Sequence, residues 1–231
     1  AAPMEDRQVG WRMGRAMDEM RAVTVARIQG WCVGGGLVVA AGCDLRIAAD
    51  TARFSIPEVD LGIPLAWGGI PRLVREIGPA LTKELVMTCR PFDAAEAKAA
   101  GFLNRVVPEA ALDTEVEALV QVLLAKPKLA LLETKAHVNA VTESMVGTGR
   151  SWADADGLYA GLRDEEGRAS AQAPRNDPLE KPLQRVESRT IGLAGHRHQH
   201  RRQRPQPHLA GRGGQHGGIK QQPALGTARG R

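Results

Sequence analysis

A glycine triplet, Gly34, Gly35 and Gly36, is the first stretch of this sequence whose residue types could support chemistry. It stands between a segment that is typical of a strand and one that is typical of a short helix. A glycine-rich turn that opens a helix leaves backbone N–H groups unpaired at the positive end of the helix dipole. Such donors suit an anion, or a carbonyl oxygen that becomes one. The triplet alone leaves open the alternative that it only allows close packing of a helix on a strand.

Glu58 is the second candidate, because it lies in a loop directly after a short predicted strand. A carboxylate in such a place could exchange protons with a substrate, or it could simply be a solvated loop residue. We interpret Asp44 and Asp60 as structural caps or surface charges. We interpret His137, which lies in a predicted helix, as a surface residue.

Several other chemistries lack their motifs in this sequence. The triplet does not have the G-x-G-x-x-G spacing of a dinucleotide-binding turn, and no Lys-Ser/Thr pair follows it as in a phosphate-binding loop. The sequence also lacks a serine nucleophile elbow, a Cys/His pair and an HExxH zinc motif. Cys32, Cys43 and Cys89 lie among apolar residues without metal-ligand spacing, so we expect three buried thiols, no metal site and a reducing, cytoplasmic location.

Alternating strands and helices must position these candidates. Hydrophobic periodicity and turn signals predict, in chain order, a helix over 11–20, a strand over 23–29, a short helix over 37–41, strands over 45–49 and 53–56, helices over 70–77, 80–88 and 94–100, a strand over 102–107, and three or four helices over 109–173. A strand, a helix and another strand at this spacing indicate a parallel βαβ unit. Asp93 with Glu96 has the pattern of a capping box.

Composition divides the 231 residues into two parts. Residues 1–173 contain 19 Lys and Arg against 23 Asp and Glu, whereas residues 174–231 contain 12 against 3 and no Phe, Trp, Tyr, Met or Cys. The second part cannot bury enough apolar surface to offset the entropy of ordering it, so we expect a disordered, low-complexity tail over 174–231. No apolar run reaches 18 residues, so we expect no membrane span. The first ten residues do not resemble a secretory signal.

The tail leaves three interpretations open. Its bias towards Arg, Gly, Pro, Gln, His and Ala resembles a shifted reading frame through GC-rich DNA, and an unstructured linker would look similar. The basic segment over 196–208 could neutralise phosphates, and His196, His198 and His200 could hold a divalent metal weakly. This segment has no aromatic residue to stack on a base, so a nucleic-acid partner is the least favoured reading.

Four segments of the sequence share a pattern with a known family. They are VARIQGWCVGGGLVVAAGCDLRIAAD at 25–50, ARFSIPEVDLGI at 52–63, WGGIPRLVREIG at 67–78 and RPFDAAEAKAAGFLNRVVP at 90–108. With them the sequence resembles the crotonase family, the enoyl-CoA hydratases and isomerases. The resemblance runs through about residues 11–173 in the order and spacing of that family, and its C-terminal part over 152–171 resembles the family's helical end.

This resemblance implies a fold of repeated ββα units followed by helices, assembled as trimers or hexamers, and an acyl-CoA thioester as substrate. The family binds the thioester oxygen with two backbone N–H groups, and Gly35 matches one of these donors. Glu58 matches the family's general acid/base. Gly34, Gly35, Gly36 and Ala66 match substrate-binding positions. No cofactor is implied, because coenzyme A is part of the substrate, and neither a membrane nor a nucleic acid is an expected partner.

The sequence departs from the family pattern at three places. Val38 stands where hydratases have a second glutamate, and Ala66 stands where dienoyl isomerases have an aspartate, so a single glutamate favours double-bond isomerisation over hydration. The family's N-terminal third, which supplies the other oxyanion donor, has no counterpart, so we expect an open sheet edge and weak activity. The third departure is the basic tail that follows the last matching helix.

We therefore expect an α/β chain that comprises a partial crotonase-like ββα superhelix over 1–108, a helical part over 109–173 and the tail over 174–231. The alternative to an enzyme is a non-catalytic or truncated paralogue that binds CoA thioesters or modulates oligomers.

Overall fold

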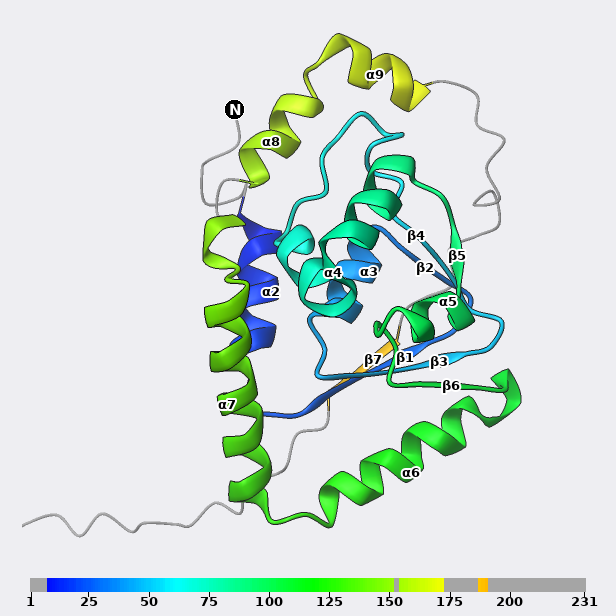
Figure 1. Cartoon of the computed structure of the whole chain (residues 1–231), viewed down its shortest axis with the longest axis vertical. Coiled ribbons are helices and arrows are strands. Elements are labelled where there is room, and N and C mark those ends of the chain that lie inside the picture. The colour runs from blue at the N-terminus through cyan, green and yellow to red at the C-terminus, as the bar shows by residue number, and fades with distance from the viewer. Residues whose placement is uncertain (1–7, 152–153, 173–186, 191–231) are drawn as a thin grey trace, which may run out of the picture. The chain divides into compact units, whose positions relative to one another are not determined.

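A computed structural model of the chain describes residues 8–151, 154–172 and 187–190 (Figure 1). All of them belong to one compact unit. Strands and helices alternate in its first part, and helices alone follow from Glu109 to Gln172. The expectation of an α/β chain with a helical second part is therefore confirmed.

Two small sheets form the centre of this unit. In the larger sheet, β6 (Arg105–Val107), β3 (Leu45–Ala49) and β1 (Thr24–Ile28) are parallel neighbours, and β7 (Glu187–Thr190) pairs antiparallel with β1. In the smaller sheet, β2 (Trp31–Val33) is parallel to β4 (Arg53–Ser55), which pairs antiparallel with β5 (Phe92–Asp93). The β1–β3 register aligns Val25 with Leu45 and Ile28 with Ala48.

The predicted parallel βαβ unit is confirmed by β1, α3 (Gly35–Ala41) and β3. The sequence analysis missed β2 and β5, which contain three and two residues. β2 lies between Gly30 and the glycine triplet, and β5 ends at the Asp93 cap, so turn and cap signals hide their extended conformation, which is set by pairing with β4.

Helices surround the sheets. In chain order they are α2 (Val9–Glu19), α3, α4 (Gly69–Thr88), α5 (Ala94–Ala99), α6 (Leu112–Leu124), α7 (Lys128–Met145), α8 (Asp154–Gly161) and α9 (Glu165–Gln172), with short 3-10 turns at Glu109–Ala111 and Gly149–Ser151. Four α-helices therefore lie in the described part of 109–172, within the predicted three or four. The predicted break in α4 is present, because Gly78 has φ +74° and Pro79 follows it.

The first residues of the predicted 102–107 strand are not in a strand. Phe102 and Leu103 both donate their backbone N–H to the Ala97 carbonyl, at 2.9 and 3.3 Å, and so close the end of α5. Gly101, at φ +92°, makes this turn possible. At the other end of α5, the Asp93 carboxylate accepts from the Glu96 N–H at 2.8 Å, as the capping pattern predicts.

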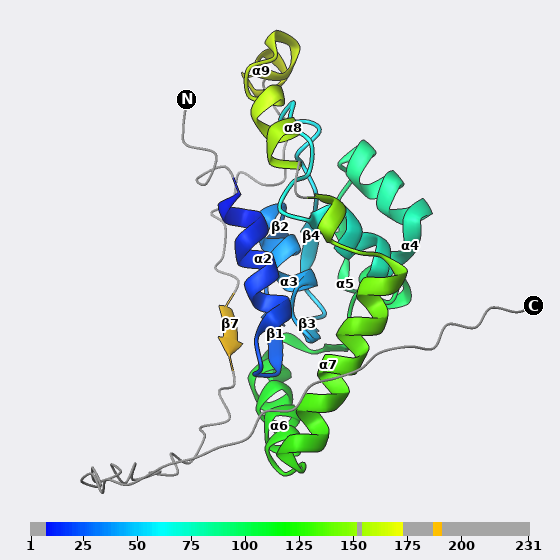
Figure 2. The ribbon, with the colours of Figure 1, turned by 90° about the vertical axis from the view of Figure 1, so that its left-hand side faces the viewer.

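The larger sheet is covered on both faces. On one face, apolar residues of β1 and β3 form a core with residues of α3, α4 and α5. This core includes Phe54 of the smaller sheet, whose ring stacks on Phe92 at 5.2 Å and meets the edge of Phe102 at 6.0 Å. On the other face Leu112 and Val116 of α6 pack on β1 and β3 (Figure 1). Helix α2 lies beside α7 (Figure 2), where the Asn139 amide donates to the Asp18 carbonyl at 3.2 Å.

Arg46, which is 4% exposed, ties these layers together. Its guanidinium donates to the Cys43 carbonyl at 2.8 Å and to the Phe102 carbonyl at 2.5 Å, and it forms an ion pair with Glu76. Burial lowers its pKa, and the Glu76 carboxylate opposes that effect. These donors satisfy backbone carbonyls that the ends of α3 and α5 leave unpaired.

The structure departs from the expected tail at residues 187–190, which form β7. β7 pairs antiparallel with the outer edge of β1. The composition argument considers only apolar side chains, whereas the exposed backbone groups of an edge strand can pair with any extended segment. The other predictions for 174–231 fall on residues outside the described part.

Candidate active site

The glycine triplet lies where the sequence analysis places it, at the junction of β2 and α3. Gly34 has φ +53° and ψ −120°, and its N–H donates to the Ser55 carbonyl at 3.0 Å. This bond fixes the triplet beside the end of β4. Gly35 and Gly36 are the first two residues of α3, so their N–H groups have no acceptor within the helix.

The Glu58 carboxyl packs against this turn. A Cβ added to Gly34 would lie 2.6 Å from Glu58 Oε1, so the carboxyl approaches the backbone as closely as a glycine allows. The backbone of Glu58 is held in a tight turn, in which its carbonyl accepts from the N–H groups of Leu61 and Ile63, both at 3.0 Å. The residue is thus fixed by β4 on one side and by its own turn on the other.

The environment of Glu58 favours the protonated form of its carboxyl. Its Oε2 atom is buried and has no hydrogen-bond partner in the structure as described. Burial raises the pKa of the carboxyl, and a hydrogen bond from its own backbone N–H opposes this effect. A buried carboxyl with a raised pKa and a free oxygen is uncommon as a structural feature and typical of functional sites.

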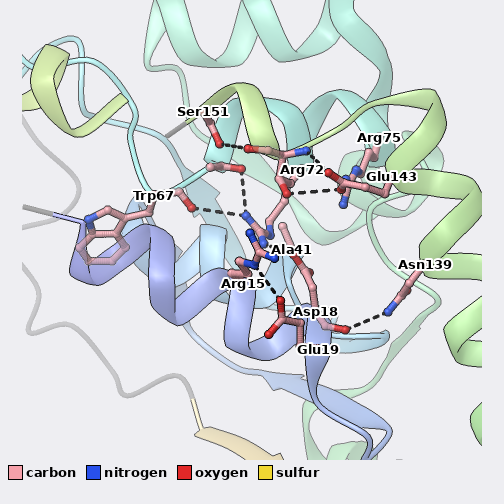
Figure 3. Close-up of polar contacts among 12 residues, drawn as sticks. Arg15, Asp18, Glu19, Ala41, Trp67, Arg72, Arg75, Asn139, Glu143 and Ser151 are labelled. Atoms are coloured by element: carbon pink, nitrogen blue, oxygen red, sulfur yellow. Dashed lines mark hydrogen bonds and ion pairs between the residues drawn. The ribbon is translucent and has the colours of Figure 1, made fainter. Parts of the chain in front are cut away.

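Trp67, which the sequence analysis missed, lies on the neighbouring glycine. A Cβ added to Gly35 would lie 2.6 Å from Trp67 Cζ3, and one added to Gly10 of α2 would overlap the indole. The ring therefore lies between the start of α2 and the first turn of α3, and Figure 3 shows it beside α2. No spacing in the sequence links Trp67 to Gly10 or Gly35, so no sequence signal identifies it.

Val38 and Ala66, the two positions where the family pattern offers a second carboxyl, are buried. Val38 is 3% exposed and packs against the start of α4, because a Cβ added to Gly69, the first residue of that helix, would lie 2.8 Å from its Cγ2. Ala66 is 7% exposed, and its carbonyl accepts from the Gly69 N–H at 3.0 Å. Neither position supplies a second carboxyl.

The other candidate residues are either paired with neighbouring groups, exposed or buried as thiols. The Asp44 carboxylate accepts from the Thr24 backbone and hydroxyl at 2.7 and 2.8 Å and pairs with Lys135. Asp60 and His137 are exposed. The three cysteines are buried and unbridged, and burial raises the pKa of Cys32 to about 12. In the described segments no three His, Cys, Asp or Glu side chains are grouped as metal ligands.

A cavity of about 580 Å³ lies elsewhere, between α2, α4 and α7. Its charged lining is engaged in ion pairs, Arg72 with Asp18, Arg75 with Glu143 and Lys135 with Asp44 (Figure 3 draws the first two pairs). Its lining includes neither Glu58 nor the glycine triplet. We therefore place the candidate site at Glu58 by its chemistry and not by the size of the cavity.

Comparisons with known proteins agree with this architecture. A sequence model of the family described as enoyl-CoA hydratase/isomerase matches residues 8–173. A Mycobacterium bovis protein with the name "Probable enoyl-CoA hydratase" is 41% identical over 130 residues, which are 56% of this chain and 51% of that protein. Crotonyl-CoA hydratase of Syntrophomonas wolfei is 36% identical over 159 residues, which are 68% of this chain and 61% of that protein.

A solved structure shows the same fold. The enoyl-CoA hydratase from Mycobacterium avium subsp. paratuberculosis superposes with a TM-score of 0.68 at 26% identity, over 74% of this chain and 71% of that one. The chain therefore belongs to the enoyl-CoA hydratase/isomerase family and has its crotonase-like fold. It spans about half the length of the Mycobacterium bovis protein. None of its described helices is both long and apolar enough to cross a membrane.

Proposed function

We propose that this protein acts on enoyl-CoA thioesters, with Glu58 as the general acid/base and the Gly35 N–H as a donor to the thioester oxygen. The observation that carries the proposal is the Glu58 carboxyl, whose Oε2 is buried without a partner and whose pKa is raised by burial. Its contact with Gly34 brings it to the residue before the proposed donor. Gly34, Gly36 and Ala66 complete the proposed substrate-binding positions.

A raised pKa suits a group that must both accept and release a proton near neutral pH. Ionised Glu58 takes a proton from the carbon next to the thioester carbonyl, and the electron pair moves onto the carbonyl oxygen. The Gly35 N–H donates to that oxygen as its negative charge develops. Because the donor is fixed at the start of α3, it needs no reorganisation during the reaction.

The apolar character of position 38 supports isomerisation over hydration. Val38 is buried and can neither activate water nor transfer a proton. With one carboxyl, the balanced reaction is a shuttle: Glu58 takes the C2 proton of a 3-enoyl thioester and returns it at C4. The double bond moves into conjugation with the carbonyl, and no water is consumed. The hydration route uses a pair of carboxyls, and neither Val38 nor Ala66 supplies the second one.

The test compares Glu58→Gln with Glu133→Gln, which changes an exposed glutamate of α7 in the same way. The substrates are a 3-enoyl-CoA, in which conjugation is followed by ultraviolet absorbance, and a 2-enoyl-CoA, in which hydration removes that absorbance. We expect conjugation in the wild type and in Glu133→Gln, and a loss of about 10²–10⁴-fold in Glu58→Gln. Binding of a saturated acyl-CoA should be retained in all three proteins.

Full turnover by Glu58→Gln would refute the role of Glu58. Hydration that exceeds isomerisation would refute the isomerase preference while leaving the site in place. Binding of acyl-CoA without turnover in any protein would support the alternative, a non-catalytic paralogue that binds CoA thioesters or modulates oligomers.

The proposal extends to assembly and location. Family resemblance supports a homo-oligomer, a trimer or hexamer, in fatty-acid metabolism. Three buried, unbridged thiols support a reducing compartment such as the cytoplasm.

A further inference from the structure

The indole of Trp67 fills the space between two helices next to the proposed donor. Gly35 of α3 and Gly10 of α2 both lack the side chain that would exclude it. The ring is nevertheless 37% exposed, in contrast to the core aromatics Phe54 and Phe102, which are at most 1% exposed. One side of this large apolar ring is covered by the two glycines, and its exposed side can contact a bound ligand.

The backbone of Trp67 is held in a conformation that non-glycine residues rarely adopt. Its φ is +61° and that of Gly68 is +69°. The Asp154 carboxylate of α8 accepts from the Gly68 N–H at 2.6 Å, while Arg72 of α4 donates to the carbonyls of Trp67 and Gly68 at 3.4 and 3.3 Å (Figure 3 draws Arg72 and Trp67). Strain of this kind persists only where surrounding contacts enforce it. These contacts fix the backbone of the turn, and the close approach to Gly10 and Gly35 holds the indole itself.

Trp67 and Glu58 flank the same turn. Glu58 packs on Gly34 and Trp67 packs on Gly35, whose Cα atoms are about 3.8 Å apart as consecutive residues. An acyl group whose oxygen accepts from Gly35 and whose α-carbon faces Glu58 has little room to avoid the indole. The aromatic ring and the reacting atoms therefore share one site.

We propose that Trp67 is a specificity-determining residue, which forms the wall of the acyl site and restricts it to short acyl chains. This inference rests on the proposed function, since it uses Gly35 as the point where the thioester is held. The occupant is an acyl-CoA thioester, and the property that Trp67 sets is the length of its acyl chain.

The test measures binding of butyryl-CoA and dodecanoyl-CoA to the full chain, with free coenzyme A as a reference. Trp67→Ala removes the wall and Trp67→Leu keeps a smaller apolar side chain at the contact with α2. Trp11→Ala is the matched control, because it deletes an indole from the neighbouring position of α2. We expect the preference for butyryl-CoA over dodecanoyl-CoA to fall roughly tenfold or more in Trp67→Ala, less in Trp67→Leu, and not at all in Trp11→Ala.

Fluorescence supplies a readout that does not depend on the alanine variant folding. Butyryl-CoA should change the tryptophan emission of the wild type and of Trp11→Phe, and should change that of Trp67→Phe much less. An unchanged chain-length preference in a folded Trp67→Ala or Trp67→Leu protein would overturn the inference. So would equal emission changes in the two phenylalanine variants. If the wild type binds no thioester, both the proposed function and this inference fail. If Glu58→Gln loses turnover while the Trp67 variants keep the wild-type chain-length preference, only this inference is refuted.

Discussion

At the scale of single residues, Glu58 combines a cost in stability with the property that the chemistry needs. Burial disfavours its ionised form and so raises its pKa from an ordinary value of 4.5. Between the ordinary and the raised pKa the folded state binds more protons than the unfolded state, so stability falls as pH rises through this window. A neutral amide of the same shape does not have this cost.

Glu58→Gln should therefore stabilise the protein at neutral pH. We expect a melting temperature higher than that of the wild type by roughly 2–4 °C at pH 8, the shift that about 1 kcal/mol produces in a chain of this size. At pH 4 the difference should nearly vanish, because the wild-type carboxyl is then protonated in the folded state. Thermal unfolding of both proteins at the two pH values measures this. A difference that does not depend on pH, or a less stable glutamine variant at pH 8, would contradict the assigned burial effect.

The sequence identifies the acid/base candidate but not its surroundings. On residue type alone Glu58 could equally be a solvated loop carboxylate, and the family resemblance is what selects it. The structure adds the contact with Gly34 and the unpartnered oxygen, which are properties of packing. Trp67 escaped prediction because its partners, Gly10 and Gly35, are far from it in sequence and no periodic pattern links them.

At the scale of elements, the turn that opens α3 depends on glycine at position 34. Gly34 has φ +53°, and a Cβ there would press on the Glu58 carboxyl. Gly78, inside α4, has φ +74° with no atom within 4 Å of an added Cβ. An alanine at either position strains the backbone, but only an alanine at position 34 also displaces Glu58, so comparing the two variants separates these effects.

Gly34→Ala and Gly78→Ala should each lower stability by about 1–3 kcal/mol, since both force an alanine into a glycine conformation. Only Gly34→Ala should also lower turnover of an enoyl-CoA, by tenfold or more, because it alone moves Glu58 from the α3 turn. Urea unfolding and turnover at saturating substrate measure the two effects. Equal turnover in the two variants would show that the contact with Gly34 does not position Glu58.

Helices and strands could be predicted where the signals that define them lie close together in the sequence. The βαβ unit, the broken helix α4 and the Asp93 cap each have signals within a few residues, and all are present. Turn and cap signals next to β2 and β5 hide these two strands, and β6 begins at Arg105 because the residues before it close α5. These departures have one cause, which is that pairing and capping with distant segments override local preference.

At the scale of the whole molecule, the edge of the larger sheet is where composition and structure differ. Residues 174–231 have the composition of a disordered tail, yet Thr24 to Arg27 of β1 pair with residues 187–190. β7 is the last described element of the chain. It lies beyond the boundary near residue 173 that composition predicts.

Two truncations test whether the folded unit includes β7 or ends near residue 173. A chain of residues 1–194 keeps β7, whereas a chain of residues 1–173 removes it and leaves the outer edge of β1 unpaired. We expect the longer chain to match the full protein in melting temperature, and the shorter one to melt several degrees lower, roughly 2–4 °C for each kcal/mol of lost pairing. The shorter chain should also form aggregates in size-exclusion chromatography, because an unpaired edge strand recruits other chains. If both truncations behave alike, β7 contributes nothing to stability, and the boundary near residue 173 that composition predicts is the correct one.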